Sequence, residues 1–107
     1  MTVMRSVSDV AQFDAAICDN DLVIAKFETQ SCVICRRIEP GLKAVTSRIG
    51  DTLDVVQVDA QELEPVAERY GVKGVPTLIL FKDGAEVSRC NGFQSTSMLN
   101  DWLAPHV

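Results

Sequence analysis

The sequence predicts an α/β fold in which a mixed β-sheet is covered by helices on both faces. Apolar, strand-like runs alternate with segments of helical periodicity, and this alternation is typical of parallel strand pairs. An Asp-Gly turn late in the chain adds an antiparallel pair. The chain has 107 residues, of which 47% are apolar and 23% charged. These values suit one globular domain over 1–107.

The first expected elements are a short strand and an amphipathic helix. We expect the strand over Thr2–Arg5 and a helix that is capped by Ser6 or Ser8. The apolar face of this helix repeats at spacings of three and four. It comprises Val10, Phe13 and Ile17. The polar segment 19–21 ends the helix.

A continuous apolar run predicts a central strand. Leu22–Glu28 opens without alternation, as expected for a strand covered on both faces. The helix that follows begins at Cys32. Its apolar face comprises Ile34, Ile38, Leu42, Val45 and Ile49. Pro40 should kink this helix, and Gly50 is its expected C-terminal stop.

The middle of the chain continues the alternation. We expect a strand over Leu53–Asp59 and a helix over Glu62–Tyr70. Pro65 suits the first turn of that helix, and Gly71 suits the position just past its end.

The C-terminal third predicts a hairpin and a last helix. Two strands, Thr77–Phe81 and Glu86–Cys90, flank the turn at Asp83-Gly84. Ser95 is the expected cap of the last helix. Its expected inward-facing residues are Met98, Leu99, Trp102 and Leu103.

The charge and the absence of long apolar runs exclude several classes of partner. The net charge is −5, whereas nucleic acids and anionic membranes attract an excess of Lys and Arg. The N-terminus lacks the roughly 7–15 apolar residues of a secretory signal. No run approaches the roughly 20 apolar residues of a membrane span. We therefore expect a cytoplasmic protein with no nucleic-acid or membrane partner.

Four cysteines are the most informative feature of the composition. Cys32 and Cys35 form a C-x-x-C motif, which in a cytosolic protein is more often catalytic or metal-binding than a structural disulfide. A structural zinc site needs four ligands. The chain offers one close pair and a single histidine, His106, so we predict no metal. We expect Cys18 to be a small buried or half-buried hydrophobe. Cys90 is either a packed strand residue or a thiol near the site.

Several motifs together resemble the thioredoxin family over almost the whole chain. They are the Cys32-Val33-Ile34-Cys35 motif at a strand-to-helix junction, Gly74-Val75-Pro76-Thr77 before an apolar strand, and Gly92 after a hairpin. A C-x-x-C motif alone is a weak signal, but its combination with the Val-Pro-Thr segment is specific. The resemblance implies the thioredoxin fold, a central mixed sheet flanked by four helices.

The resemblance also implies roles for particular residues. Cys32 matches the nucleophilic cysteine and Cys35 the resolving cysteine, and Pro76 matches a cis-proline that lies against the disulfide. Gly74, Val75, Thr77 and Gly92 match the substrate groove, in which Val75 would offer its backbone groups to an extended client.

Elementary chemistry supports the roles of the two cysteines. Thiol–disulfide exchange needs a thiolate. A cysteine at a helix N-terminus faces unpaired N–H groups and the positive end of the helix dipole, and both stabilise the anion. The i, i+3 spacing places Cys35 one turn into the helix, where it can bond to Cys32. Arg36 and Arg37 add positive charge to the same turn.

The chain departs from the family pattern around the motif. The family has Trp-Cys-Gly-Pro-Cys, whereas this chain has Ser31 in place of the tryptophan and Val33-Ile34 between the cysteines. Val33 and Ile34 would expose an apolar surface beside the sulfur atoms. The intervening dipeptide also sets the field at the disulfide, and about 30 mV of potential corresponds to about 1.4 kcal/mol.

A second departure lies in the strand before the motif. Lys26 takes the position of the family's buried aspartate, and Glu28 lies on the same strand face. The family's lysine on the next strand aligns near Val55. One interpretation is a Lys26–Glu28 pair beneath Cys35, where a cation favours the thiolate or a neutral amine acts as a base. The other is that Lys26 extends to water.

These observations lead to a prediction of function. We expect a thiol–disulfide oxidoreductase of thioredoxin type with an altered reduction potential, in which Lys26, Glu28, Val33 and Ile34 tune the site. It would act on protein disulfides as a monomer and need no bound cofactor. A flavin thioredoxin reductase is the expected electron donor, although the replaced Trp and Gly-Pro remove surface that such a reductase would contact.

Two alternatives remain open at this point. The apolar Val33-Ile34 surface also suits a thioredoxin-fold adaptor that holds clients with little turnover. A glutaredoxin-like enzyme would need a basic cradle for glutathione, for which Lys73 and Arg36 are candidates.

Overall fold

The chain folds into a five-stranded sheet with helices on both sides. A computed structural model describes residues 4–107. The elements, in chain order, are β1 (Arg5–Ser6), α1 (Val10–Ala16), β2 (Leu22–Glu28), α2 (Val33–Arg37), α3 (Glu39–Ile49), β3 (Leu53–Asp59), α4 (Glu64–Arg69), β4 (Thr77–Lys82), β5 (Ala85–Asn91) and α5 (Thr96–Leu103), followed by a 3₁₀ turn over Ala104–His106.

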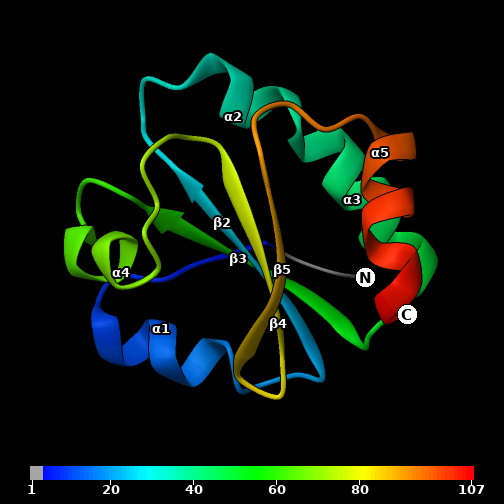
Figure 1. The fold of residues 1–107 in the computed structure, drawn as a ribbon, viewed down its shortest axis with the longest axis horizontal. Coiled ribbons are helices and arrows are strands. Elements are labelled where there is room, and N and C mark those ends of the chain that lie inside the picture. Colours follow the sequence, from blue (N-terminus) through cyan, green and yellow to red (C-terminus); the bar gives the residue numbers. More distant parts are fainter. Residues whose placement is uncertain (1–3) are drawn as a thin grey trace.

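The sheet is mixed, as predicted, and its strand order is β1-β3-β2-β4-β5. The central strand β2 runs parallel to β3 and antiparallel to β4. Figure 1 shows α2 and α3 on the opposite side of the twisted sheet from α1. Both β2 and β3 have the predicted bounds, because continuous Val, Leu and Ile runs suit strands that are covered on both faces.

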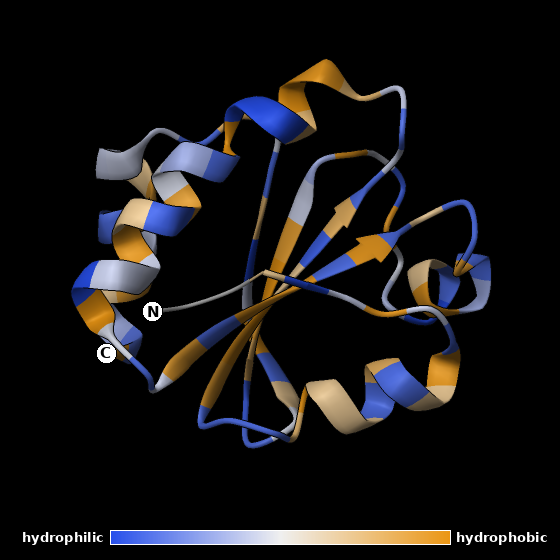
Figure 2. Ribbon diagram, turned by 180° about the vertical axis from the view of Figure 1, so that it is seen from behind, coloured by the Kyte–Doolittle hydropathy of each residue, from blue (hydrophilic) through white to orange (hydrophobic). Residues whose placement is uncertain are grey.

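Two apolar clusters fill the layers on either side of the sheet. One lies under α1 and α4 and includes Phe13, Phe27 and Val66, and the other lies under α3 and α5 and includes Leu42 and Leu99. In Figure 2 the hydrophobic colour runs along the central strands, while the helices alternate between apolar and polar residues. The helices are therefore amphipathic, and their apolar sides are used in the two clusters.

The hairpin is confirmed at the predicted turn. Asp83 and Gly84 have φ values of 53° and 82° and connect β4 to β5. Two consecutive residues with positive φ define the primed turn that matches strand twist. Both strands extend slightly beyond the predicted bounds.

The predictions at the start of the chain were only partly right. Residues 2 and 3 of the expected strand Thr2–Arg5 lie outside the described residues, and β1 comprises Arg5 and Ser6. The cap of α1 is Asp9, not Ser6 or Ser8. Asp9 is extended, and its carboxylate accepts a hydrogen bond from the N–H of Gln12 at 2.8 Å.

The long helix expected from Cys32 to Gly50 is two helices. They are separated at Ile38, and Pro40 lies in the first turn of α3. Pro40 has no N–H to donate to the carbonyl four residues earlier, so the ladder of hydrogen bonds stops and a second helix begins.

Two further helix predictions need correction. α4 begins at Glu64 rather than Glu62, because the Asp59 carboxylate accepts from the N–H groups of Gln61 and Glu62 and holds this segment as a turn. In α5 the cap Ser95 is confirmed, but Met98 is 47% exposed, whereas Leu99 and Leu103 are buried. Within residues 4–107, none of the helices combines the length and the apolarity that spanning a bilayer requires.

Candidate active site

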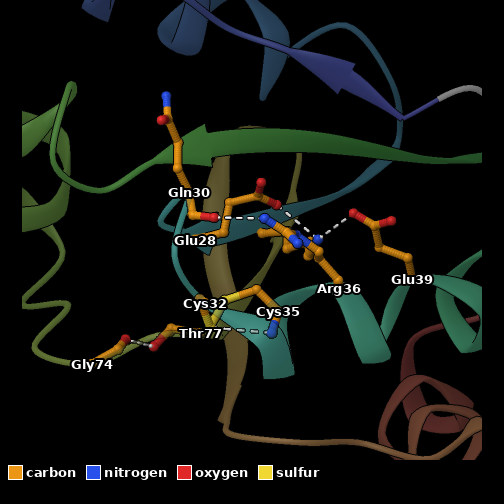
Figure 3. The surroundings of a disulfide bond; sticks show 9 residues. Glu28, Gln30, Cys32, Cys35, Arg36, Glu39, Gly74 and Thr77 are labelled. Carbon is orange, nitrogen blue, oxygen red and sulfur yellow. Dashed lines mark hydrogen bonds and ion pairs between the residues drawn. A yellow bond between two sulfur atoms is a disulfide. The ribbon is translucent and has the colours of Figure 1, made fainter.

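The C-x-x-C motif lies where β2 leads into α2. Cys32 caps α2, and its Sγ accepts a hydrogen bond from the Cys35 N–H at 3.2 Å. The two cysteines form a disulfide, with their Cα atoms 5.3 Å apart. Cys35 is 1% exposed and Cys32 is half-buried, so the sulfur at the helix end is the one within reach of another molecule. Figure 3 shows this disulfide and its surroundings.

Two loops border the disulfide. The Val75–Pro76 peptide bond is cis, as the resemblance implied. The Gly92 N–H donates to the Pro76 carbonyl at 2.8 Å, so the two loops are joined directly. The Thr77 hydroxyl donates to the Gly74 carbonyl at 2.7 Å, and Figure 3 draws both residues among the surroundings of the disulfide. The structure therefore brings together the motifs that lie far apart in the sequence.

Lys26 is fully buried, at 0% exposure, and its ammonium group has two carboxylate partners. Nζ lies 2.7 Å from Glu28 Oε1 and 3.0 Å from Glu39 Oε1. The contact to Glu39 has hydrogen-bond geometry, whereas the contact to Glu28 is an ion pair outside it. The interpretation in which Lys26 extends to water is therefore wrong, because its ammonium group is buried and paired with both carboxylates.

Glu39 and Gln57 also belong to this cluster, and no sequence pattern predicted their membership. The strand register places Gln57, not Val55, opposite Lys26, and Gln57 Nε2 donates to Glu39 Oε1 at 3.4 Å. Glu39 reaches the cluster because α3 restarts immediately after Ile38. The Glu28 and Glu39 side chains are 27% and 30% exposed, so the cluster is closed at Lys26 and open to water at its acidic end.

The dipeptide between the cysteines is exposed, as expected. Val33 is 57% exposed and Ile34 is 46% exposed. Phe93, which follows Gly92 in the neighbouring loop, is 50% exposed. Three apolar side chains from the two elements that border the disulfide are therefore turned to solvent.

Arg36 stabilises the loop that precedes the motif. Its Nη2 donates to the Gln30 carbonyl at 2.8 Å, and the Cys32 N–H donates to the Thr29 carbonyl at 3.2 Å. The Arg36 side chain, which the sequence predicts to add positive charge near the thiolate, thus also holds residues 29–31.

We expect Arg36→Ala to loosen this loop without unfolding the protein. The loss in unfolding free energy should be about 0.5–1 kcal/mol, since one exposed hydrogen bond is removed. Amide exchange at Cys32 should become faster. Arg37→Ala is the matched control, because Arg37 is exposed in the same helix and its side chain has no hydrogen bond among the described residues. Equal exchange rates in the two variants would contradict the role of Arg36.

The other two cysteines are free and lie in different environments. Cys18 is exposed, so the prediction of a buried or half-buried residue was wrong: α1 ends at Ala16, and Cys18 lies in the turn beyond it. Cys90 packs against the cluster under α5, and burial raises the pKa of its thiol to about 12. This supports the interpretation of Cys90 as a packed strand residue.

An alkylation experiment distinguishes these two thiols. With the Cys32–Cys35 disulfide intact, iodoacetamide at pH 8.5 should modify Cys18 readily and Cys90 only slowly, because a thiol whose pKa is about 12 is almost entirely protonated there. Mass mapping of the peptides gives both rates. If Cys90 in the folded protein were modified as fast as Cys18, its thiol would be accessible to solvent and the burial of Cys90 would be contradicted.

The fold and the site together define a class of protein. A mixed sheet that presents a redox-capable disulfide at a helix N-terminus, beside a cis-proline loop, is the arrangement of a thiol–disulfide oxidoreductase. The family model described as Thioredoxin matches residues 4–105. The chain belongs to the thioredoxin family.

Relatives of known identity agree with this assignment. Thioredoxin of Bacillus subtilis (strain 168) is 32% identical over 104 residues, which cover 97% of this chain and all of the relative. Thioredoxin 1 of Synechococcus elongatus is 31% identical over 108 residues, covering both chains completely. The solved structure of Plasmodium falciparum thioredoxin has a TM-score of 0.86 at 27% identity and covers 97% of this chain and 100% of its own.

Family and site together establish the kind of activity. The protein is a thioredoxin-type protein disulfide oxidoreductase. Membership of the family implies protein disulfides as substrates and a monomeric chain.

Proposed function

We propose that Cys32 attacks the client disulfide and that Cys35 resolves the intermediate. The observation that carries this assignment is the difference in access: Cys32 caps α2 at the half-buried helix end, whereas Cys35 is 1% exposed. The Cys32 thiolate forms a bond to one client sulfur, and the other client sulfur leaves with the electron pair. Cys35, as a thiolate, then bonds to Cys32 Sγ and releases the second client sulfur.

The client lies along the loop that contains Pro76. Among the described residues, none of the backbone hydrogen bonds outside helices and strands involves Val75, so its N–H and C=O are available to an extended peptide. Gly74, Thr77 and Gly92 complete the groove. Pro76 is buried and has no N–H that would compete with the client.

The tuning of the site is assigned to Lys26 and its partners. Lys26 is buried on β2, the strand that leads into the motif, and a cation near a thiolate stabilises it relative to a neutral side chain, which favours the reduced form. Glu28 and Glu39 limit this effect, since their two negative charges lie within 3.0 Å of Nζ. We therefore expect a reduction potential that differs from that of ordinary thioredoxin, and Val33 and Ile34 contribute to the difference from the solvent side.

The wider setting follows from the same proposal. Residues 1–107 act as one thioredoxin domain in the cytoplasm without a bound cofactor. A flavin thioredoxin reductase supplies the electrons. This reductase would have to dock on Ser31, Val33 and Ile34 in place of the usual aromatic and Gly-Pro surface.

A trapping experiment with insulin as the client disulfide tests the two roles. The Cys35→Ser variant should accumulate a mixed disulfide between Cys32 and insulin, because the resolving thiol is missing. The Cys32→Ser variant should form none. Equal trapping by the two variants, located by peptide mapping, would contradict the assignment of attacking and resolving cysteines.

The exposure of Val33, Ile34 and Phe93 favours a second function, namely the binding of unfolded clients as an adaptor. Binding without turnover predicts that wild-type protein and the Cys32→Ser variant reduce insulin at the same, uncatalysed rate while both still bind it. Catalysed reduction by the wild type alone would assign the exposed surface to substrate docking instead.

A further inference from the structure

We propose that the cavity beside Val75 is a specificity subsite that binds a cationic side chain, Lys or Arg, of the client polypeptide. The cavity measures about 340 Å³ and is bordered by α4, by the loop before Val75 and by Thr29. The inference rests on the proposed function, since it assumes that the client lies along the Pro76 loop. It adds the chemical class of residue that the client carries next to its disulfide.

Two of the residues that line the cavity are connected directly to the motif or to the cis-proline loop. Thr29 accepts the backbone hydrogen bond of Cys32, and Val75 forms the cis peptide bond with Pro76. A peptide that pairs with the Val75 backbone would therefore extend over the mouth of the cavity. Figure 1 shows α4 at the same side of the sheet as the loop that leads into β4.

The lining combines an apolar floor with an acidic rim. Ala67, Val72 and Val75 supply apolar surface, and Glu64 and Glu68 lie one turn apart on α4. Among residues 4–107, neither glutamate has an ion-pair or side-chain hydrogen-bond partner. Both carboxylates are exposed and therefore available to a ligand.

The neighbouring charged groups do not cancel this acidity. Arg69, the cation of α4, is paired with Asp14 on α1 at 2.6 Å. Asp59 Oδ1 accepts from the N–H groups of Gln61 and Glu62, and this carboxylate does not line the cavity. Lys73 is the one cation in the lining, against two glutamates. The cavity thus carries an excess of one negative charge.

A Lys or Arg side chain matches both parts of the cavity. Its aliphatic stem can cover the apolar floor while its charged head remains at the solvated, acidic rim. An acidic client side chain would meet Glu64 and Glu68 at the same place and be disfavoured. A neutral aliphatic side chain would gain the floor contacts alone.

The test uses symmetric disulfide-linked peptides of the form Gly-X-Gly-Cys-Gly and a second series, Gly-Cys-Gly-X-Gly. Side chains two residues apart in an extended chain lie on the same face, so one series places X at the cavity. X is Lys, norleucine or Glu. Reduced protein transfers two electrons to the peptide disulfide, and the released thiols are quantified after acid quenching. In one series we expect Lys to react about threefold to fivefold faster than norleucine, and Glu slower than both, as for an exposed ion pair.

Variants assign the preference to the cavity. The double variant Glu64→Gln/Glu68→Gln should bring the Lys-to-norleucine ratio close to one. Glu62→Gln is the matched control, since Glu62 is exposed but does not line the cavity, and it should retain the preference. Equal rates for Lys and norleucine in both series, or a preference that survives in the double variant, would overturn the inference. Failure to reduce any of the peptides would instead contradict the proposed function on which it rests.

Discussion

The Cys32→Ser variant is expected to lose all catalysed reduction of protein disulfides. A serine hydroxyl cannot replace the thiolate that attacks the client sulfur, and Cys35 is 1% exposed and out of reach of a folded client. The loss in rate should be at least about 10³-fold, as for the removal of a nucleophile that acts as part of a unit. Insulin reduction in the presence of dithiothreitol gives the measurement.

The controls for this result use the remaining cysteines. Cys18→Ser should reduce insulin at the wild-type rate, because Cys18 lies in the turn after α1, away from the motif. Cys90→Ala should also retain activity, with a small loss of stability from the packed site under α5. Significant turnover by Cys32→Ser, or its loss in Cys18→Ser, would show that the disulfide between Cys32 and Cys35 is not the reacting group.

The Lys26→Met variant is expected to change both the stability and the reduction potential. Methionine preserves most of the volume but leaves Glu28 and Glu39 without their shared cation. Both carboxylates are about one-third exposed and can recruit water. The free energy of unfolding should therefore fall by about 1–3 kcal/mol, which is less than the penalty for breaking a fully buried ion pair. Removing the positive charge destabilises a thiolate at the site. The midpoint reduction potential of the Cys32–Cys35 pair should therefore become more negative, by about 30 mV, which corresponds to about 1.4 kcal/mol.

An opposite charge change provides the matching test. Glu39→Gln keeps the shape of the side chain but removes one negative charge next to Lys26 Nζ. The midpoint should then become less negative than in the wild type. Lys43→Met, on the exposed side of α3, should change neither quantity. Shifts of the same sign in Lys26→Met and Glu39→Gln would show that altered packing, not charge, determines the potential.

Local signals were sufficient for most of the fold. The apolar runs of β2 and β3, the Asp83-Gly84 turn and the Ser95 cap depend on residues close in sequence, and they are found at the predicted positions. The predictions failed at the starts of helices, where two residues close in sequence could each determine where the helix begins. Asp9 caps α1 although Ser8 precedes it, and Pro40 starts a new helix rather than bending an existing one.

The candidate site was predictable only where motifs specified it. Cys32, Cys35 and the Pro76 loop were identified from their order along the chain, and the Lys26–Glu28 pair from strand alternation. Glu39 was missed because its contact with Lys26 depends on how α3 packs over β2, which no short-range pattern encodes. Cys18 was misplaced for a related reason: its exposure depends on where α1 ends.

A redox titration of the wild-type protein in glutathione buffers, with peptide mapping at each point, tests the central claim most directly. We predict a single two-electron transition in which Cys32 and Cys35 alone change state, while Cys18 and Cys90 remain thiols. The midpoint reduction potential should differ from the roughly −270 mV of ordinary thioredoxin. A transition that omits either Cys32 or Cys35 would contradict the assignment of the redox pair, and a midpoint equal to that value would contradict the tuning by Lys26 and its partners.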